Sequence, residues 1–320
     1  MKKVSIIMST YKTPEKFLNE AINSILNQTY KNIELIIVCD GDIDEYNRIN
    51  KLYNNKIKLL YNEKNKGLPY SLNLAIKNAT GDYIARMDSD DISLNNRIER
   101  QVEYLEKNPD VGICGTEAML FGSKKGIKRI YLKEREQVKI QLLYKATLIH
   151  PTIMGRKEVF EEFKYNERFI YAQDFELWSR VSEKYNITIL PVIGLKYRVH
   201  DKQASIKKKE EQARLSMETI KNNSEKITGK YDDRICQTLY VLGGRKGLTK
   251  GNYKEISNNI DYILEKNLKY KDADLKKVLY NRFFELMLKN RIITFNFNVV
   301  KKCMRIYNLK DIIEVLKNGK

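Results

Sequence analysis

The first half of the chain alternates short apolar runs with segments in which apolar residues recur every three or four positions. Short apolar runs predict buried strands, and the longer recurrence predicts amphipathic helices. Strands are expected over residues 4–9, 34–40, 57–63, 83–87, 111–121 and 187–193. Helices are expected over residues 14–28, 68–78, 95–107, 157–163 and 173–180. This alternation is typical of an α/β fold in which helices cover a mainly parallel sheet.

The first expected helix carries its own start signals directly after the first expected strand. Thr13 is a preferred N-cap residue, Pro14 suits the first helical position, and Glu15 adds a negative charge to the first turn. We therefore expect Thr13 to cap a helix that begins at Pro14 and packs its apolar face on the sheet.

Polar residues follow three of the expected strands, at residues 9–11, 40–42 and 88–90. In open α/β sheets, ligands bind outside the carboxyl ends of the strands. Because the carboxyl ends of parallel strands meet at the same edge of a sheet, we expect these three segments to lie along one crevice. The sequence therefore predicts a binding site at that edge.

Composition and charge divide the chain into two regions. With 320 residues and 42% hydrophobic content, the chain can form one large domain with an appendage. Residues 1–205 contain 33 basic and 27 acidic residues (net +6), and residues 206–320 contain 26 and 14 (net +12). We predict a catalytic domain over residues 1–205 and a basic, mainly helical region over 206–320. The first helix of this region is expected to end near residue 223. The others are expected to span residues 232–242, 254–267, 273–289 and 299–316.

Cysteine usage and hydropathy predict a cytoplasmic protein. Cys39, Cys114, Cys236 and Cys303 lie far apart without C-x-x-C spacing, which argues against a zinc site or a disulfide framework and indicates buried thiols in a reducing compartment. The apolar run at the N-terminus is too short for a signal peptide, and no run is long enough to span a bilayer. The basic C-terminal region suits peripheral association with anionic lipid on the inner face of the membrane. An ordinary solvated face explains the same composition.

The strand expected at residues 83–87 ends in three carboxylates within four positions, Asp88, Asp90 and Asp91. Asp88 and Asp90 stand two residues apart, so a slight turn brings both onto one hard divalent cation. A simpler alternative is an acidic loop in which Asp91 and Ser93 start the next helix. The chain has neither a G-x-G-x-x-G segment after its first strand nor a P-loop, so a bound diphosphate needs another counter-charge. A metal at Asp88 and Asp90 supplies it.

Three segments of the chain are similar to one known family. Residues 4–30, 33–41 and 65–91 contain V-S-I-I-M-S-T-Y-K, A-I-x-S-I-L-x-Q-T-Y, E-L-I-I-V-x-D-G and G-D-Y-I-A-R-M-D-S-D-D. This ordered pattern resembles the family-2 glycosyltransferases with the GT-A fold. The resemblance implies a metal-dependent, inverting transfer of a sugar from a nucleotide-diphosphate sugar, with UDP as the expected nucleotide. It also implies a glycan or lipid-linked acceptor, a role in capsule or lipopolysaccharide synthesis, and Mn²⁺ or Mg²⁺ as cofactor.

The resemblance assigns roles to individual residues of the first half. In it, residues 9–11 line the nucleoside pocket, Asp40 accepts the imide hydrogen of the base, Asp88 faces the ribose or a metal-bound water, and Asp90 holds the cation. Arg86 either contacts the diphosphate or orients the carboxylates. The expected nucleotide-sugar residues are Ser9, Thr10, Tyr11, Asp40, Asn65, Gly67, Arg86, Asp88 and Ser89. Cys39-Asp40-Gly41-Asp42 departs from the usual D-D-G-S, which leaves the base less certain.

Three motifs of the second half complete the expected site. Gln173-Asp174-x-x-Leu177-Trp178 resembles the family's E-D-x-x-L-W, which makes Asp174 the general base, with Gln173 in place of the usual Glu. Tyr197-Arg198-Val199-His200, expected after the strand at residues 187–193, resembles Y-R-x-H. In that motif the histidine closes the metal shell or contacts the diphosphate, and an imidazole ligand favours Mn²⁺. The H-P-T-x-M segment puts His150 on the acceptor side, with Asp91 and Trp178 as further candidates.

Structural roles compete with each of these assignments. Asp174 can simply cap its helix, His150 and Trp178 can be core residues, and His200 can be a solvated loop residue. Two other functions remain open for the whole chain. A sugar-1-phosphate nucleotidyltransferase also uses a nucleotide on a related sheet, but its glycine-rich basic signature is absent. A nucleic-acid-binding protein explains the net charge of +18, yet the basic excess lies away from the motifs, so no nucleic acid partner is expected.

Overall fold

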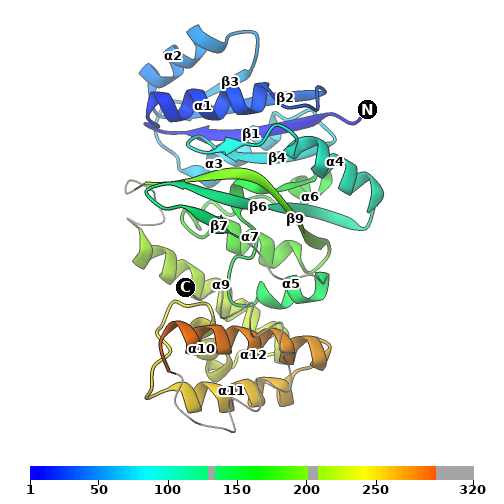
Figure 1. Ribbon diagram of the computed structural model, residues 1–320, viewed down its shortest axis with the longest axis vertical. Helices are drawn as coiled ribbons and strands as arrows, with labels where there is room; N and C mark the ends of the chain where they lie inside the picture. Colours follow the sequence, from blue (N-terminus) through cyan, green and yellow to red (C-terminus); the bar gives the residue numbers. More distant parts are fainter. Residues whose placement is uncertain (129–133, 201–207, 293–320) are drawn as a thin grey trace. The chain divides into compact units, whose positions relative to one another are not determined.

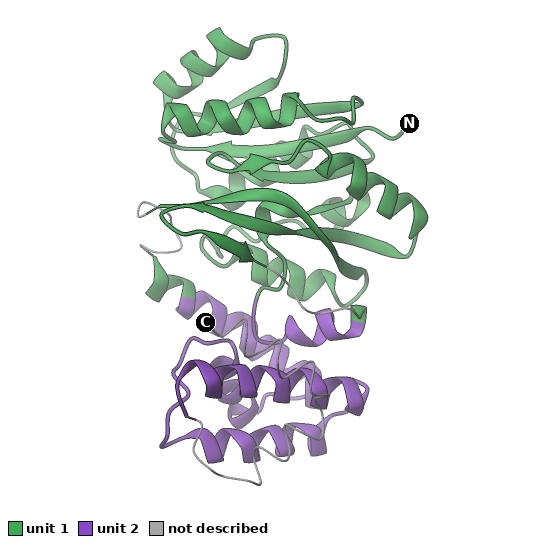
Figure 2. Cartoon of the chain, in the orientation of Figure 1, with its two compact units in different colours: residues 1–135, 146–212 green, residues 136–145, 213–320 purple. Residues whose placement is uncertain are grey.

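The computed structural model describes residues 1–128, 134–200 and 208–292 (Figure 1). The chain forms two compact units, one of residues 1–135 and 146–212 and one of residues 136–145 and 213–320 (Figure 2). The boundaries of these units are similar to those expected for domains at residues 1–205 and 206–320. The division into these two domains stays a prediction. The helix expected over residues 299–316 and Cys303 lie outside the described residues.

The first unit is built on a nine-stranded mixed sheet, counted over the described residues. Four parallel strands form one half: β1 (Val4–Thr10), β2 (Ile33–Asp40), β3 (Lys58–Asn62) and β4 (Tyr83–Asp88). The other half contains β5 (Ile92–Ser93), β6 (Val111–Gly122), β7 (Gly126–Lys128), β8 (Met154–Arg156) and β9 (Asn186–Val199). The order is β3-β2-β1-β4-β8-β6-β9-β5, with β7 paired to β6. The predicted α/β class with a mixed, mainly parallel sheet is confirmed.

Helices cover both faces of the parallel half. One face packs against α1 (Glu15–Leu26), α2 (Ile43–Tyr53) and α4 (Arg97–Lys107), whose apolar side chains join Tyr83, Ala85 and Met87 of β4 in one core. On the other face, α3 (Leu68–Lys77) packs on β1 and β2, and α6 (Lys157–Glu162) packs on β4. Because strand side chains alternate between faces, Arg86 and Asp88 point away from the core that contains Met87.

Two local predictions were wrong. The N-cap of α1 is Pro14 rather than Thr13, and the helix begins at Glu15. Thr13 has other partners, because its N–H donates to Oε1 of Glu45 at 3.1 Å and its hydroxyl lies 2.8 Å from that of Ser89. The second error concerns β9, which runs on to Val199, so the Y-R-V-H segment lies mostly inside the strand rather than after it.

Helix α2 was not predicted, although the sequence contains its start signal. The side chain of Asp42 caps the helix by accepting a hydrogen bond from the N–H of Glu45 at 3.0 Å. This is the aspartate-first form of a D-x-x-E cap. Ile43, Tyr46, Ile49 and Leu52 also recur every three positions, so the hydrophobic pattern contains a second signal for this helix.

The second unit is helical, as predicted. It contains most of α5 (Arg135–Gln141) and of α9 (Lys209–Thr228), together with α10 (Asp233–Leu242), α11 (Tyr253–Lys266) and α12 (Asp272–Lys289). Phe283, Leu286 and Met287 are buried, and α10, α11 and α12 pack against one another. Among the described helices of the chain, none is both long and apolar enough to cross a lipid bilayer. Cys39, Cys114 and Cys236 are buried free thiols, as expected.

Candidate active site

The carboxyl ends of three parallel strands meet at one edge of the sheet. The register pairs Ser9 of β1 with Asp88 of β4, and Thr10 of β1 with Cys39 of β2. The segments after these strands therefore start side by side, as the sequence predicted. The rest of the candidate site is built around this edge.

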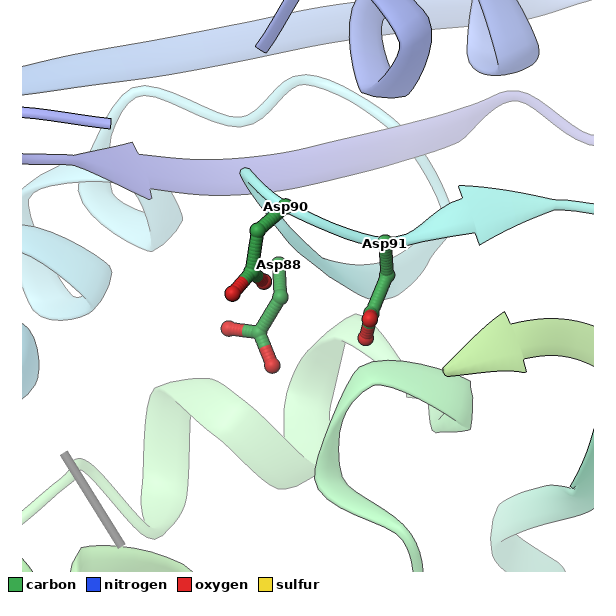
Figure 3. A group of neighbouring side chains, drawn as sticks. All are labelled: Asp88, Asp90 and Asp91. Carbon is green, nitrogen blue, oxygen red and sulfur yellow. The ribbon is translucent and has the colours of Figure 1, made fainter. Parts of the chain in front are cut away.

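Three aspartates gather where β4 leads into β5. Asp88, Asp90 and Asp91 each offer one carboxylate oxygen, and these oxygens lie within 4.8 Å of one another; their side chains are drawn in Figure 3. Asp91 is fully buried. Its Oδ1 accepts a hydrogen bond from the N–H of Arg198 at 2.7 Å, and its Oδ2 has no partner within residues 1–128, 134–200 and 208–292. Burial, followed by the charges of Asp88 and Asp90, raises the pKa of Asp91 well above its usual range. The alternative, an acidic loop in which Asp91 and Ser93 start the next helix, was wrong, because β5 (Ile92–Ser93) follows Asp91 and α4 begins at Arg97.

Arg86 pairs with the first of these aspartates. Both residues lie on the same face of β4, and Nη1 of Arg86 donates to Oδ2 of Asp88 at 2.7 Å while Nη2 donates to Oδ1. Burial raises the pKa of Asp88 against the lowering effect of Arg86, and Asp90 and Asp174 raise it further. Arg86 was expected either to contact the diphosphate or to orient a carboxylate. These hydrogen bonds orient the carboxylate of Asp88.

His200 lies against the second aspartate. Its Nε2 is 2.9 Å from Oδ2 of Asp90, and its ring is 5.7 Å from that of Phe17. Within the described residues, the group of mutually close ligand atoms comprises the three aspartates and does not include His200. The structure therefore places the imidazole where it orients Asp90, and its metal role stays a prediction.

Hydrogen bonds from residues outside the motifs hold the segment after β1 in place. Oγ1 of Thr10 lies 2.9 Å from Oγ1 of Thr13 and 3.0 Å from Oε1 of Glu45. Thr13 in turn contacts Ser89 of the acidic segment. Tyr11 is 45% exposed at the sheet edge, where a planar ligand can reach it. No pattern in the sequence marked Thr13 or Glu45 as part of this arrangement.

Asp40 anchors a neighbouring loop. Its carboxylate accepts hydrogen bonds from Nδ2 of Asn62 at 2.8 Å, from the N–H of Lys66 at 2.9 Å and from the N–H of Gly67 at 2.8 Å. Gly41 has a φ of +88°, and a Cβ there would lie 2.3 Å from the backbone nitrogen of Asn65, so only glycine fits. The structure brings Asp40, Asn65 and Gly67 together, and contact with a nucleotide base stays a prediction.

Asp174 lies in the first turn of α7 (Gln173–Val181), as predicted. Its Oδ1 accepts a hydrogen bond from the N–H of Phe175 at 2.7 Å. Burial raises the pKa of Asp174, and Phe175, Arg86 and Lys128 oppose this rise. Arg86 and Asp88 are therefore close enough to interact electrostatically with Asp174. Lys128 lies on β7, outside every motif, so no sequence pattern marked it as a site residue.

The residues expected on the acceptor side include an aromatic group. His150 begins the short 3₁₀ helix η1 (His150–Thr152) and is 8% exposed. Its Nε2 is 2.8 Å from the hydroxyl of Tyr165, and its ring is 5.9 Å from that of Trp178. Burial, and then the charge of Arg86, lowers the pKa of His150 well below its usual value, so the ring is neutral. Trp178 is fully buried and also packs on Phe160, which gives it a core role.

Comparisons with known proteins identify the family. Residues 5–164, half of the chain, match the model of glycosyl transferase family 2. An uncharacterized glycosyltransferase of Methanocaldococcus jannaschii is 32% identical over 249 residues, which cover 74% of this chain and 83% of the relative. The chain belongs to glycosyl transferase family 2.

Two further similarities refine this placement in family 2. The O-antigen biosynthesis glycosyltransferase WbnJ of Escherichia coli is 34% identical over 207 residues, 62% of this chain and 80% of the relative. The crystal structure of S. aureus TarS 1–349 in complex with UDP-GlcNAc has a TM-score of 0.60 at 16% identity and covers 99% of this chain and 92% of that one. At this identity the likeness shows the fold alone, and the GT-A fold predicted from the sequence is confirmed. The family match contains the acidic cluster and ends before Asp174 and His200.

The acidic cluster offers carboxylate oxygens that could hold a divalent cation. Carboxylate oxygens are the ligands preferred by Mg²⁺ and Mn²⁺. Among the residues that the structure describes, the buried Oδ2 of Asp91 has no hydrogen-bond partner, and Asp91 offers an oxygen close to those of Asp88 and Asp90. An orphaned buried carboxylate oxygen is costly unless a cation compensates it. The residues present therefore fit a bound cation.

Proposed function

We propose that the protein is a metal-dependent, inverting glycosyltransferase that moves a sugar from a UDP-sugar to a hydroxyl group of a glycan or lipid-linked acceptor. One observation carries the proposal. The cluster of Asp88, Asp90 and Asp91 lies close enough to Asp174 for electrostatic interaction, yet Asp174 is not part of the cluster. Such a site contains one place for a cation and a separate carboxylate that can accept a proton.

Asp88, Asp90 and Asp91 would hold Mn²⁺ or Mg²⁺, with His200 orienting Asp90. When bound, the cation would neutralise charge on the departing nucleoside diphosphate. Arg86 adds a buried positive charge beside Asp88. Both effects favour the diphosphate as a leaving group.

Asp174 is the proposed general base. Its carboxylate accepts the proton of the acceptor hydroxyl, and the acceptor oxygen forms a bond to the anomeric carbon of the donor. The bond from that carbon to the diphosphate breaks, and the nucleoside diphosphate leaves with its electron pair. A raised pKa makes Asp174 a stronger base than an ordinary aspartate. A single displacement of this kind inverts the anomeric centre without a covalent intermediate.

The donor and the acceptor follow from the relatives as proposals. The TarS structure contains UDP-GlcNAc, which supports a UDP-sugar with a hexosyl or N-acetylhexosaminyl group. Ser9, Thr10, Tyr11 and the loop held by Asp40 are the proposed nucleoside side, and His150 borders the proposed acceptor side. WbnJ acts in O-antigen biosynthesis, which supports a role in lipopolysaccharide or capsule synthesis.

We also place the protein in the cytoplasm, with peripheral contact to the inner face of the membrane. The support is the net charge of +12 on residues 206–320, which attracts anionic lipid. Cosedimentation with phosphatidylglycerol vesicles at low salt, and its loss at high salt, tests this location. Equal binding to phosphatidylcholine vesicles would contradict it.

A donor-hydrolysis screen tests the reaction. Nucleotide sugars are incubated with Mn²⁺ or Mg²⁺, and the released nucleotide is identified for the wild type, Asp174→Asn and Asp90→Ala. Release of a nucleoside diphosphate that requires a metal and both carboxylates supports the proposal. Pyrophosphate release would indicate a nucleotidyltransferase, and full turnover in both variants would overturn the assigned residues. NMR of the product then reports the anomeric configuration.

A further inference from the structure

Arg198 makes a set of contacts around the acidic cluster that no role above explains. It lies near the end of β9 and is 8% exposed. Its Nε donates to the backbone carbonyl of Asp90 at 2.7 Å, and its backbone N–H donates to Oδ1 of Asp91 at 2.7 Å. One residue of a distant strand thus holds two consecutive residues of the cluster.

The guanidinium group of Arg198 is itself fixed from three sides. It lies 4.0 Å from the ring centroid of Phe17 and 4.4 Å from that of Phe121, and Nη2 donates to Oε2 of Glu20 at 2.5 Å. Phe17 and Glu20 come from α1, and Phe121 comes from β6. Two aromatic faces and a carboxylate leave the planar group little freedom.

The bonds of Arg198 differ from those of Arg86. Arg86 contacts both carboxylate oxygens of Asp88, the atoms that Asp88 would also offer to a cation. In the contacts above, the side chain of Arg198 instead holds the main chain of Asp90 and directs its ion pair to Glu20. It therefore fixes the segment without using the carboxylate of Asp90, whose Oδ2 contacts His200.

We propose that Arg198 is a positioning residue for the metal site, a role that rests on the proposed metal-dependent function. It sets the backbone of Asp90 and Asp91 so that their oxygens converge with that of Asp88. Residues behind metal ligands typically change metal affinity by about 10–100-fold when they are replaced. Lysine cannot replace it, because a single ammonium group cannot stack between two rings while it contacts both Asp90 and Glu20.

Direct Mn²⁺ binding, measured by electron paramagnetic resonance, tests this role without reference to turnover. Arg198→Lys is compared with the wild type, with Asp90→Ala and with Arg156→Lys. Arg156 is a matched control, because it also donates to backbone carbonyls, of Val111 and Leu105, and lies 5.7 Å from the ring of Tyr83, away from the cluster. We expect Arg198→Lys to weaken Mn²⁺ binding by about tenfold or more, and Arg156→Lys to leave it unchanged.

Activity as a function of Mn²⁺ concentration supplies a second readout. A positioning role predicts that the kcat of Arg198→Lys recovers at saturating Mn²⁺, whereas general damage to the fold lowers kcat at every concentration. Wild-type Mn²⁺ affinity in Arg198→Lys, with binding lost in Asp90→Ala, overturns the inference and leaves the proposed function intact. Equal binding by the wild type and Asp90→Ala overturns both. If Arg198→Lys does not fold, Glu20→Gln decides: weaker Mn²⁺ binding supports the role, and unchanged binding overturns it.

Discussion

The pKa values of carboxylates shift in opposite directions at the two ends of the parallel strands. At the amino ends, burial alone would raise the pKa of Glu34, but hydrogen bonds from Ser5 and Thr80 and the ion pair with Lys3 lower it to about 2. The N–H of Lys3 likewise lowers the pKa of Asp82. At the carboxyl ends, burial raises the pKa of Asp91 and of Asp174. The same sheet therefore stabilises charge at one edge and tolerates unfavourable charge at the other.

This difference separates stability from function. Carboxylates with lowered pKa values contribute to folding, since their charged form is favoured in the folded state. Carboxylates with raised pKa values cost stability at neutral pH, and clusters of them occur where a ligand or a reaction uses the charge. Substitutions at the two edges should consequently have opposite effects on activity and stability.

The largest effect is expected for Asp174→Asn. The amide cannot accept the proton of the acceptor, so we expect kcat to fall by about 10²–10⁴-fold. Stability should not fall, because the substitution removes a charge that burial disfavours. Steady-state kinetics and a thermal unfolding scan measure the two quantities. A loss of activity that is matched by a large fall in Tm would mean that Asp174 is a structural cap.

Asp91→Asn should affect stability and Mn²⁺ affinity in opposite directions. The side-chain oxygen can still accept the N–H of Arg198, and the new amide can donate to a neighbouring carboxylate, so metal-free stability should stay equal or rise. Because the pKa of Asp91 is raised, its charge lowers stability as the pH rises above the ordinary aspartate range, and the variant should lack this decline. Mn²⁺ affinity should fall by roughly tenfold or more. Urea titrations over pH and Mn²⁺ binding check both results, and lower stability with unchanged Mn²⁺ affinity would contradict them.

Glu34→Gln tests the opposite edge. At pH 7 we expect a loss of about 1–2 kcal/mol in the free energy of unfolding, since solvent screens part of the interactions of a partly exposed carboxylate, with kcat unchanged. The lowered pKa means that this stabilisation is present above the ordinary glutamate pKa and is lost as the pH falls from there to about 2. The difference between variant and wild type in urea titrations should accordingly shrink below pH 4 or so. A fall in kcat without a loss of stability would break the separation between the edges.

Much of the fold could be predicted because local signals and tertiary structure agree. The strands ending at Thr10, Asp40 and Asp88 are apolar runs buried on both faces, and such runs are recognisable without tertiary information. Helix α2 was missed although apolar residues recur in it at helical spacing. Two of them, Ile43 and Leu52, are exposed, so its apolar residues do not form one continuous buried face. The length of β9 was underestimated because apolar and polar residues alternate in its last part, so the continuous apolar run ends before the strand does.

The candidate site was predictable only where a motif contains the residue. Asp88, Asp90 and Asp174 could be named from short patterns, and the register of the parallel strands predicts that two of them lie at the ligand-binding edge. Glu45 and Lys128 could not be named, because each reaches the site through tertiary packing of an element that carries no motif. The sequence makes Asp91 a candidate for the acceptor side. Its burial beside Asp88 and Asp90 could not be predicted, because it depends on the bend after β4.

The smallest effect is expected for Lys128→Met, and it sharpens the comparison at the reactive edge. Lys128 lowers the pKa of Asp174, so its removal should raise that pKa further. A general base is active when it is deprotonated, and activity is lost as the pH falls through its pKa. The acid limb of kcat/KM should therefore move to higher pH, while the rate well above that limb stays the same. A solvent-accessible charge pair of this kind changes the rate on the acid limb by about twofold.

Lys125→Met is the matched control, because Lys125 precedes the same strand and is exposed. It should leave the pH profile unchanged. Equal shifts in both variants would mean that overall charge, rather than the proximity of Lys128 to Asp174, sets the profile. A shift to lower pH in Lys128→Met would contradict Asp174 as the group that titrates, since removal of a nearby cation can only make a carboxylate easier to protonate. The pH profile thus tests the identity of the base independently of its replacement.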